Sequence, residues 1–211
     1  MSISGLVQAV ATSPALAQAL ADADVARTHE LTGPAAVHPF VIAGLAARRP
    51  VLVVTATVRE AEDLTAVLGE VVDPARLAFY PAWETLPHER LSPRSDTVGK
   101  RLAVLRRLKH PGADADNGPI NVLVAPIRSV LQPQVKGLAD LAPVEVRVGD
   151  AVPPETLVRQ LAQAAYSRVD LVEKRGEFAV RGGIVDVFPP TEEHPLRVEF
   201  FGDDVDEIRS F

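Results

Sequence analysis

The sequence predicts an α/β protein: a parallel-sheet domain, followed by a smaller α+β domain with a mostly antiparallel sheet. In the first two thirds of the chain, short apolar runs alternate with helical patterns, which is typical of parallel strands joined by helices. In the last third, short strand patterns alternate with turn residues and indicate hairpins. The distribution of charge divides the chain at a similar place. Residues 1–169 carry 17 basic and 17 acidic side chains, whereas residues 170–211 carry 5 basic and 11 acidic ones. A chain of 211 residues has room for two domains.

The first elements follow from composition and from apolar runs. Residues 3–23 are rich in alanine and leucine and predict one or two short helices around Pro14. A strand-like stretch at 29–33 and a helical stretch at 34–48 come next. The apolar run at 51–55 ends in a polar turn, and it predicts a buried parallel strand.

The remaining elements of the first domain continue the alternation. Helical spacing predicts a helix over 58–70, and apolar runs predict strands at 77–80 and 121–125. Ser95 or Asp96 can cap a further helix. Its apolar positions are Val98, Leu102, Leu105 and Leu108. Residues 111–119 contain proline, glycine, aspartate and asparagine without a large apolar side chain, and they predict a flexible surface loop.

The second domain begins after an irregular stretch, residues 132–143. We place the boundary near the end of this stretch, which gives domains at 1–142 and 143–211. Residues 144–148 alternate like a strand, and Pro153-Pro154 opens a helix. The apolar stripe of that helix is Leu157, Leu161 and Ala165. Strand patterns follow at 168–173, 177–181, 184–188, 196–201 and 205–211.

Composition excludes several classes of protein. The chain has no cysteine, so disulfide frameworks, cysteine-zinc sites and thiol nucleophiles are excluded. No apolar run reaches the ~18–20 residues of a membrane span, and the N-terminus lacks the basic start of a signal peptide. The formal net charge of −6 gives no global signal for nucleic-acid binding. We expect a cytoplasmic monomer that does not associate with membranes.

The phosphate loop of nucleotide-binding α/β proteins is absent. That loop needs G-x-x-x-x-G-K-[ST], with lysine on the phosphates and a hydroxyl on magnesium. Counted from Gly33, the second glycine is replaced by His38, the lysine by Pro39 and the hydroxyl by Phe40. Proline has neither an ammonium group nor a backbone N–H to donate. We therefore expect no ATPase activity from these residues.

Other catalytic and metal-binding patterns are absent as well. The five histidines do not have H-x-x-x-H or H-E-x-x-H spacing. No G-x-S-x-G nucleophile motif occurs. The sequence therefore predicts no catalytic residue, no metal site and no cofactor.

One helix suggests an alternative function in DNA binding. The helix that follows Ser95 carries five cations within ten residues, and such a row can contact nucleic-acid phosphates. These cations are Lys100, Arg101, Arg106, Arg107 and Lys109. The competing interpretation is an ordinary solvated helix face, because no platform of aromatic residues accompanies the cations.

The second domain offers a surface for a protein partner. Residues two apart in a strand share a face, so Arg197 and Phe201 lie on the polar face of strand 196–201. If this strand pairs with the neighbouring hairpin, Arg181 joins them on one surface. Arginine and aromatic side chains surrounded by acids are typical of an interface hot spot. The alternative is that Phe201 packs under a loop or at the domain junction while the arginines pair with local acids.

Two long segments resemble the bacterial transcription-repair coupling factor (Mfd) family. Residues 79–108, FYPAWETLPHERLSPRSDTVGKRLAVLRRL, look like a characteristic segment of that family. RGEFAVRGGIVDVFP (175–189) and LRVEFFGDDVDEIRSF (196–211) look like the module that the family shares with the excision-repair protein UvrB. The W-E-T-L-P segment favours the coupling factors over UvrB. The resemblance extends over nearly the whole chain from Glu30 onward.

The resemblance implies an adaptor. It implies a degenerate helicase-like α/β domain (1a) followed by domain 2, which binds UvrA and recruits it to stalled RNA polymerase. The implied UvrA contacts are Arg181, Arg197 and Phe201. The family's ATP-driven translocase, which binds DNA, and its polymerase-binding domains would lie C-terminal to Phe211. UvrB has a further arginine where this chain has Ala179, so one contact of the UvrB type is expected to be missing.

Overall fold

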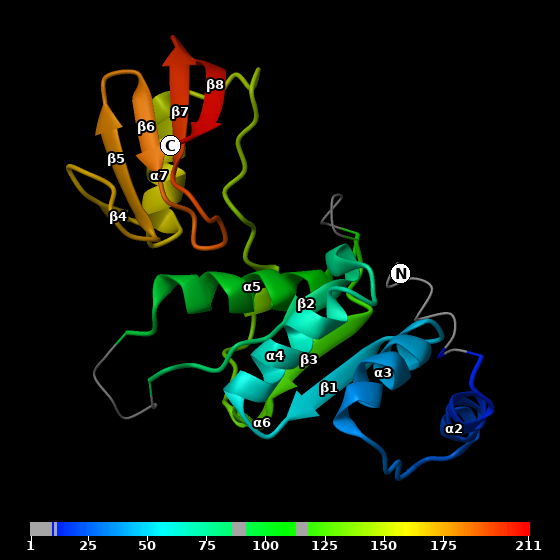
Figure 1. Ribbon diagram of the computed structural model, residues 1–211. Helices are drawn as coiled ribbons and strands as arrows, with labels where there is room; N and C mark the ends of the chain where they lie inside the picture. Colours follow the sequence, from blue (N-terminus) through cyan, green and yellow to red (C-terminus); the bar gives the residue numbers. More distant parts are fainter. Residues whose placement is uncertain (1–9, 11, 86–91, 113–117) are drawn as a thin grey trace. The chain divides into compact units, whose positions relative to one another are not determined.

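The computed structural model describes residues 10, 12–85, 92–112 and 118–211 (Figure 1). The described residues form two compact units, the first drawn from residues 1–83 and 103–139 and the second from residues 84–102 and 140–211. Unit 1 holds a parallel three-stranded sheet, and unit 2 holds a mostly antiparallel five-stranded sheet. The predicted fold class is therefore confirmed.

The helices and strands up to residue 140 are mostly those that the apolar patterns predict. The α-helices are α2 (Pro14–Val25), α3 (His38–Ala46), α4 (Val58–Leu68), α5 (Ser95–Lys109) and α6 (Ile127–Leu131). The strands are β1 (Val51–Thr55), β2 (Leu77–Phe79) and β3 (Val122–Pro126). Short 3-10 turns are η1 (Ala35–Val37), η2 (Pro74–Arg76) and η3 (Leu138–Asp140). In the described part of the chain, no helix has both the length and the apolar composition that crossing a bilayer requires.

Two expectations about this part need comment. Residues 29–33 are irregular and exposed, and the strand predicted there is wrong. Among the described residues, no neighbouring strand is present to pair with them. Pro14 is the first residue of α2, in keeping with the tolerance of proline in a first turn. Three stretches lie outside the described residues: residues 3–9 and 11 of the predicted helical stretch 3–23, the centre of the predicted loop (113–117) and residues 86–91 of the family-like segment.

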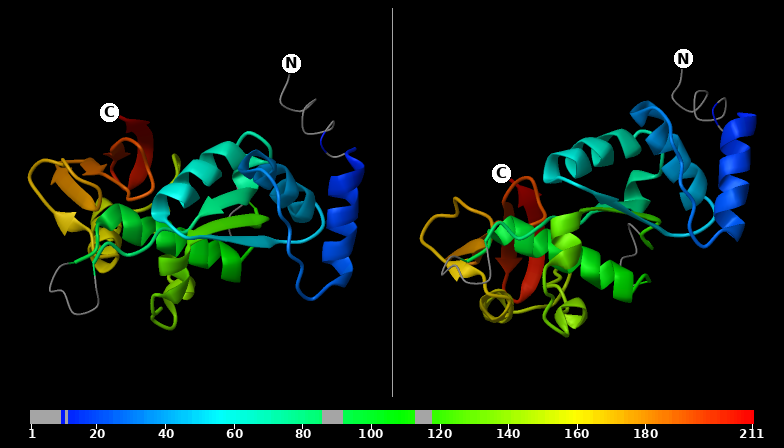
Figure 2. Two further views of the ribbon diagram at one scale, coloured as in Figure 1. Left: turned by 60° about the horizontal axis from the view of Figure 1, so that its bottom comes forward. Right: turned by 90° about the horizontal axis from the view of Figure 1, so that it is seen from below.

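The sheet of unit 1 has the order β1-β3-β2 and is covered on both faces (Figure 2). Successive residues of a strand point to opposite faces. Val122 and Val124 of β3 therefore pack in the cluster that includes residues of α3 and α4. Leu123 and Ala125 pack in a second cluster, with Val104 of α5. This double coverage explains why β3 is an almost continuous apolar run.

The described residues of unit 2 include the first part of α5, a second helix and five strands. The second helix is α7 (Pro154–Gln163). The strands are β4 (Ser167–Arg168), β5 (Glu177–Arg181), β6 (Ile184–Val187), β7 (Leu196–Phe201) and β8 (Asp204–Ser210), arranged in this order in the sheet. Leu157 and Leu161 of α7 pack against Phe178, Val185 and Val198. One face of the sheet therefore forms the core with α7, and the opposite face lies away from that core.

Three details of unit 2 differ from expectation. Residues 144–148 form no strand: Val144 and Val146 pack against the core, but the only bridge nearby joins Ala151 to Asp204. The strand expected at 168–173 is reduced to the two-residue β4. Ala165 does not continue the stripe of α7, since the helix ends at Gln163 and Ala165 is exposed in the left-handed region with φ 64°.

The start of β5 is held by a carboxylate, which gives a prediction about pH. The side chain of Glu177 accepts hydrogen bonds from the backbone N–H groups of Glu173 (2.9 Å) and Lys174 (2.8 Å). These hydrogen bonds lower the pKa of Glu177. A lowered pKa in the folded state stabilises the fold above the pKa of the unfolded chain, and this stabilisation disappears as the pH falls through the folded value. We expect Glu177→Gln to reduce the free energy of unfolding near neutral pH by less than about 1 kcal/mol, because solvent screens the site.

Urea unfolding measured in steps from about pH 7 to about pH 3 checks this expectation. The difference between Glu177→Gln and the unsubstituted chain should shrink as the pH falls. Glu193→Gln, at an exposed position, is the control. A difference that is constant over the whole range would contradict the role assigned to the Glu177 charge.

Candidate protein-binding surface

The sheet of unit 2 presents one face away from its core, which we call the outer face. Strand register defines it, because directly paired residues share a face. One row of paired residues runs Ala179, Asp186, Arg197, Arg209, and the next runs Arg181, Ile184, Glu199, Glu207. Phe201 continues the outer face along β7, opposite Asp204. The structure thus brings the three predicted contact residues, Arg181, Arg197 and Phe201, onto one face.

Phe201 is the most exposed large hydrophobic residue of this face. It ends β7, and the two-residue turn that follows contains Gly202 at φ 65°, in the left-handed region that glycine adopts easily. The neighbouring Phe200 packs against the core, while 82% of Phe201 is exposed. The alternative that Phe201 packs under a loop is therefore wrong. An exposed phenylalanine at the end of a rigid hairpin is suited to enter an apolar pocket of a partner.

Arg197 is already paired within the chain. Its Nε and Nη2 donate to the two carboxylate oxygens of Asp186 at 2.7 and 2.8 Å. The guanidinium also lies over the ring of Phe211, 5.0 Å from its centre. The hydrogen bond to Asp186 raises the pKa of Arg197, so the side chain stays charged. Pairing with a local acid, the alternative considered for the arginines, is what the structure shows for Arg197.

Arg181 has a different environment. It is exposed at the end of β5, and its Nη2 donates to the backbone oxygen of Asp170 at 2.6 Å. Arg209, the third arginine of the outer face, pairs with Glu199 at 2.8 Å. Within the described residues, Arg181 is the one arginine of this face with no carboxylate in ion-pair contact. Its charge is therefore available to an acidic group of a partner.

Sequence reasoning missed Asp186 and Phe211, the two residues that hold Arg197. Asp186 is buried on the outer face, although it lies in a strand between two valines. A charged residue in the centre of an apolar strand is the signal that points to it, because a buried carboxylate needs a partner. Register alone identifies that partner, since Asp186 lies directly opposite Arg197.

The basic helix proposed for DNA binding does not present a single row of exposed cations. Arg101 is 1% exposed. Arg107 donates through Nη2 to the backbone oxygens of Ala75 (2.6 Å) and Gly118 (3.1 Å). Of the five cations, Arg101 therefore lies in the interior, and Arg107 is hydrogen-bonded to the backbone. Lys100 and Lys109 are exposed, and Arg106 is half-buried.

The residues at the phosphate-loop position do not form a phosphate site. Gly33 is followed by η1, and α3 begins at His38 with Pro39 buried in its first turn. After β1, the backbone N–H groups of Ala56 and Thr57 donate to the carboxylate of Glu60, at 3.1 and 3.3 Å. A carboxylate of the chain thus occupies amides that could otherwise bind an anion. Among the described residues, no group of three or more acidic or histidine side chains has the arrangement of a metal site.

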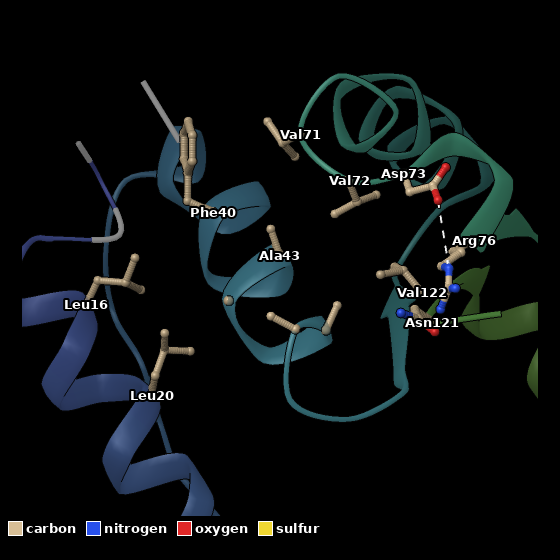
Figure 3. A pocket seen from close by; sticks show the side chains of 13 residues that line it. Leu16, Leu20, Phe40, Ala43, Val71, Val72, Asp73, Arg76, Asn121 and Val122 are labelled. Atoms are coloured by element: carbon tan, nitrogen blue, oxygen red, sulfur yellow. Dashed lines mark ion pairs between the residues drawn. The ribbon is translucent and has the colours of Figure 1, made fainter. Parts of the chain in front are cut away.

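Unit 1 also contains an apolar pocket of about 380 Å³ (Figure 3). Leu16, Leu20 and Phe40 contribute apolar side chains, and the ion pair between Arg76 and Asp73 (3.8 Å) lies at its polar end. Asn121 and Val122 line it where β3 begins. Open α/β sheets bind ligands at the carboxyl ends of their strands. This pocket lies instead at the amino end of β3, so it does not correspond to such a site.

Comparison with known proteins gives matches over both units. A family model described as "UvrB interaction domain" matches residues 144–211, which include the whole outer face. The transcription-repair-coupling factor of Mycobacterium tuberculosis (strain CDC 1551 / Oshkosh) is 51% identical over 212 residues, covering 99% of this chain and 17% of the relative. That of Bacillus subtilis (strain 168) is 32% identical, covering 77% of this chain and 13% of the relative. That of Escherichia coli (strain K12) is 31% identical, covering 86% and 15%.

Proposed function

Because the chain belongs to the family of transcription-repair-coupling factors, we propose that its outer face binds UvrA in transcription-coupled nucleotide excision repair. The chain spans 17% of the length of the mycobacterial relatives that it matches. The proposed role is therefore that of one part of such a factor: an adaptor that recruits UvrA to stalled RNA polymerase in the cytoplasm.

One observation carries the proposal. The region that matches the UvrB interaction domain contains a solvent-facing aromatic and an arginine without a carboxylate partner in the described residues, both on the same sheet face. Arg181 and the β7 residues lie two strands apart, which is roughly 10 Å at the usual strand spacing. That separation suits one continuous contact with a partner.

The proposed contact is surface complementarity without catalysis. Phe201 would enter an apolar pocket on UvrA, and Arg181 would pair with a carboxylate near that pocket. The absence of a phosphate-loop lysine, with Pro39 in its place, supports an adaptor that hydrolyses no ATP with these residues. Translocation on DNA and contact with RNA polymerase are proposed for other parts of such factors.

The charge of Arg181 provides the direct test. We expect Arg181→Ala to weaken binding of purified UvrA by about 1–2 kcal/mol, roughly five- to thirtyfold in Kd, because an acidic partner group loses its counter-charge. Isothermal titration calorimetry measures the change, and circular dichroism verifies that the variant is folded.

Arg159→Ala is the matched control for this substitution. It removes the same charge from an exposed position on α7, which packs on the opposite side of the sheet. UvrA affinity should then remain as in the unsubstituted chain. Equal affinities for Arg181→Ala, Arg159→Ala and the unsubstituted chain would contradict the assignment of the outer face.

A further inference from the structure

We propose that Asp186 is a positioning residue of the binding surface, which fixes the Arg197 guanidinium in the orientation that the partner contacts. This inference rests on the proposed function, because it assumes that the outer face binds UvrA. The residues expected to contact the partner are arginines and a phenylalanine, whereas Asp186 is acidic.

The geometry shows how Asp186 controls Arg197. Only 11% of the Asp186 side chain is exposed, whereas 31% of the Arg197 side chain is exposed. Both carboxylate oxygens of Asp186 accept from Arg197, in a two-pronged pair. Of the five N–H groups of an arginine side chain, three therefore remain for a partner.

Phe211 restricts the same guanidinium from one side. Its ring centre is 5.0 Å from the guanidinium carbon, and its backbone N–H donates to the oxygen of Pro195 at 3.2 Å. Arg197 is thus held along one edge by Asp186 and on one face by Phe211. An arginine that is already ordered loses less conformational entropy when a partner binds.

Without Asp186, the neighbouring charges favour another position for Arg197. Arg209 lies directly opposite Arg197 on β8, so the two cations repel each other. Glu199, two residues along β7, is an acid that Arg197 can approach, and it already pairs with Arg209. Removal of the Asp186 charge would therefore let Arg197 turn toward Glu199 and away from its present orientation.

The sign of the effect distinguishes positioning from simple charge neutralisation. If Asp186 only reduced the positive charge of the face, its neutralisation would strengthen binding to an acidic partner. If Asp186 positions Arg197, its neutralisation weakens binding. We expect Asp186→Asn to raise the Kd for UvrA about three- to tenfold.

A double-mutant cycle tests whether the effect passes through Arg197. UvrA binding is measured by calorimetry for Asp186→Asn, Arg197→Ala and the double variant, with folding verified by circular dichroism. In the Arg197→Ala background, Asp186→Asn should have no further effect. Glu155→Gln removes the same charge from an exposed position on α7, on the opposite side of the sheet, and its affinity should be unchanged.

Arg197→Lys provides a second measurement in case Asp186→Asn does not fold. Lysine keeps the charge but cannot form the two-pronged pair, so we expect weaker UvrA binding. Unchanged or tighter binding by the folded Asp186→Asn variant, or unchanged binding by Arg197→Lys, overturns the inference. If Phe201→Ala lowers binding while these variants do not, the proposed function stands and the inference alone fails. If the unsubstituted chain does not bind UvrA, both fail.

Discussion

Phe201→Ala is expected to weaken UvrA binding by about 2 kcal/mol or more, roughly thirtyfold in Kd. Phe201 is 82% exposed, so its side chain contributes little to the stability of the fold. The substitution therefore removes contact area that only a partner can cover. Full burial of a phenylalanine contributes about 1.5–3 kcal/mol. Calorimetry with purified UvrA measures the change. The free energy of unfolding should change by no more than about 0.5 kcal/mol, as for other surface substitutions.

Leu131→Ala is the control for this loss of apolar surface. Leu131 is 75% exposed at the end of α6, outside the region that matches the UvrB interaction domain. Its truncation should leave UvrA affinity unaltered. Phe201→Ala binding as tightly as Leu131→Ala would show that the aromatic does not anchor the partner. Reduced binding with loss of folding would assign Phe201 a structural role.

Gly99→Ala is expected to destabilise the chain by about 1–3 kcal/mol, although alanine normally favours a helix over glycine by about 1 kcal/mol. Gly99 lies within α5, and a Cβ atom at this position would come 2.4 Å from the Cβ of Pro190. The proline ring cannot turn aside as a flexible side chain can. Both residues belong to unit 2, so the clash would displace packed residues of that unit. Urea unfolding measures the free energy.

Gly44→Ala is the matched control within a helix. Gly44 lies in α3, and a Cβ atom there would meet the side-chain end of Leu20, at 2.7 Å. Leucine can change its rotamer, so the cost of this contact is small and the gain in helix propensity offsets it. We expect a change within about 0.5 kcal/mol. An equally small change for Gly99→Ala would contradict close packing against Pro190.

The two interpretations of the basic helix differ in what they require of its side chains. A phosphate-binding row needs cations that face solvent together. Arg101 is instead buried, and Arg107 bridges two backbone oxygens. Helical periodicity could not reveal this, because it reports which residues share a face but not which elements cover that face. The outer face of unit 2 therefore carries the stronger functional argument.

Strand periodicity grouped Arg197 with Phe201, and it placed Arg181 on the same surface on the assumption that the strands pair. Alternation with a period of two residues is a local property of extended backbone, so a single strand determines which side chains share its face. The same local rules predicted β1, α4, β3 and α7 closely. They failed at residues 29–33 and 144–148, where a strand-like pattern has no neighbouring strand to complete its hydrogen bonds.

Periodicity could not predict which charged side chains are paired within the chain. Nor could it predict which unit each segment packs in. Arg197 is paired because register places Asp186 directly opposite, whereas Arg181 has only a backbone oxygen. The described residues of the range 84–102 lie in unit 2, although the residues on both sides of that range lie in unit 1. These facts depend on contacts between residues far apart in the chain. Local composition predicted the elements and their faces, and only tertiary packing decided which groups on those faces remain available to a partner.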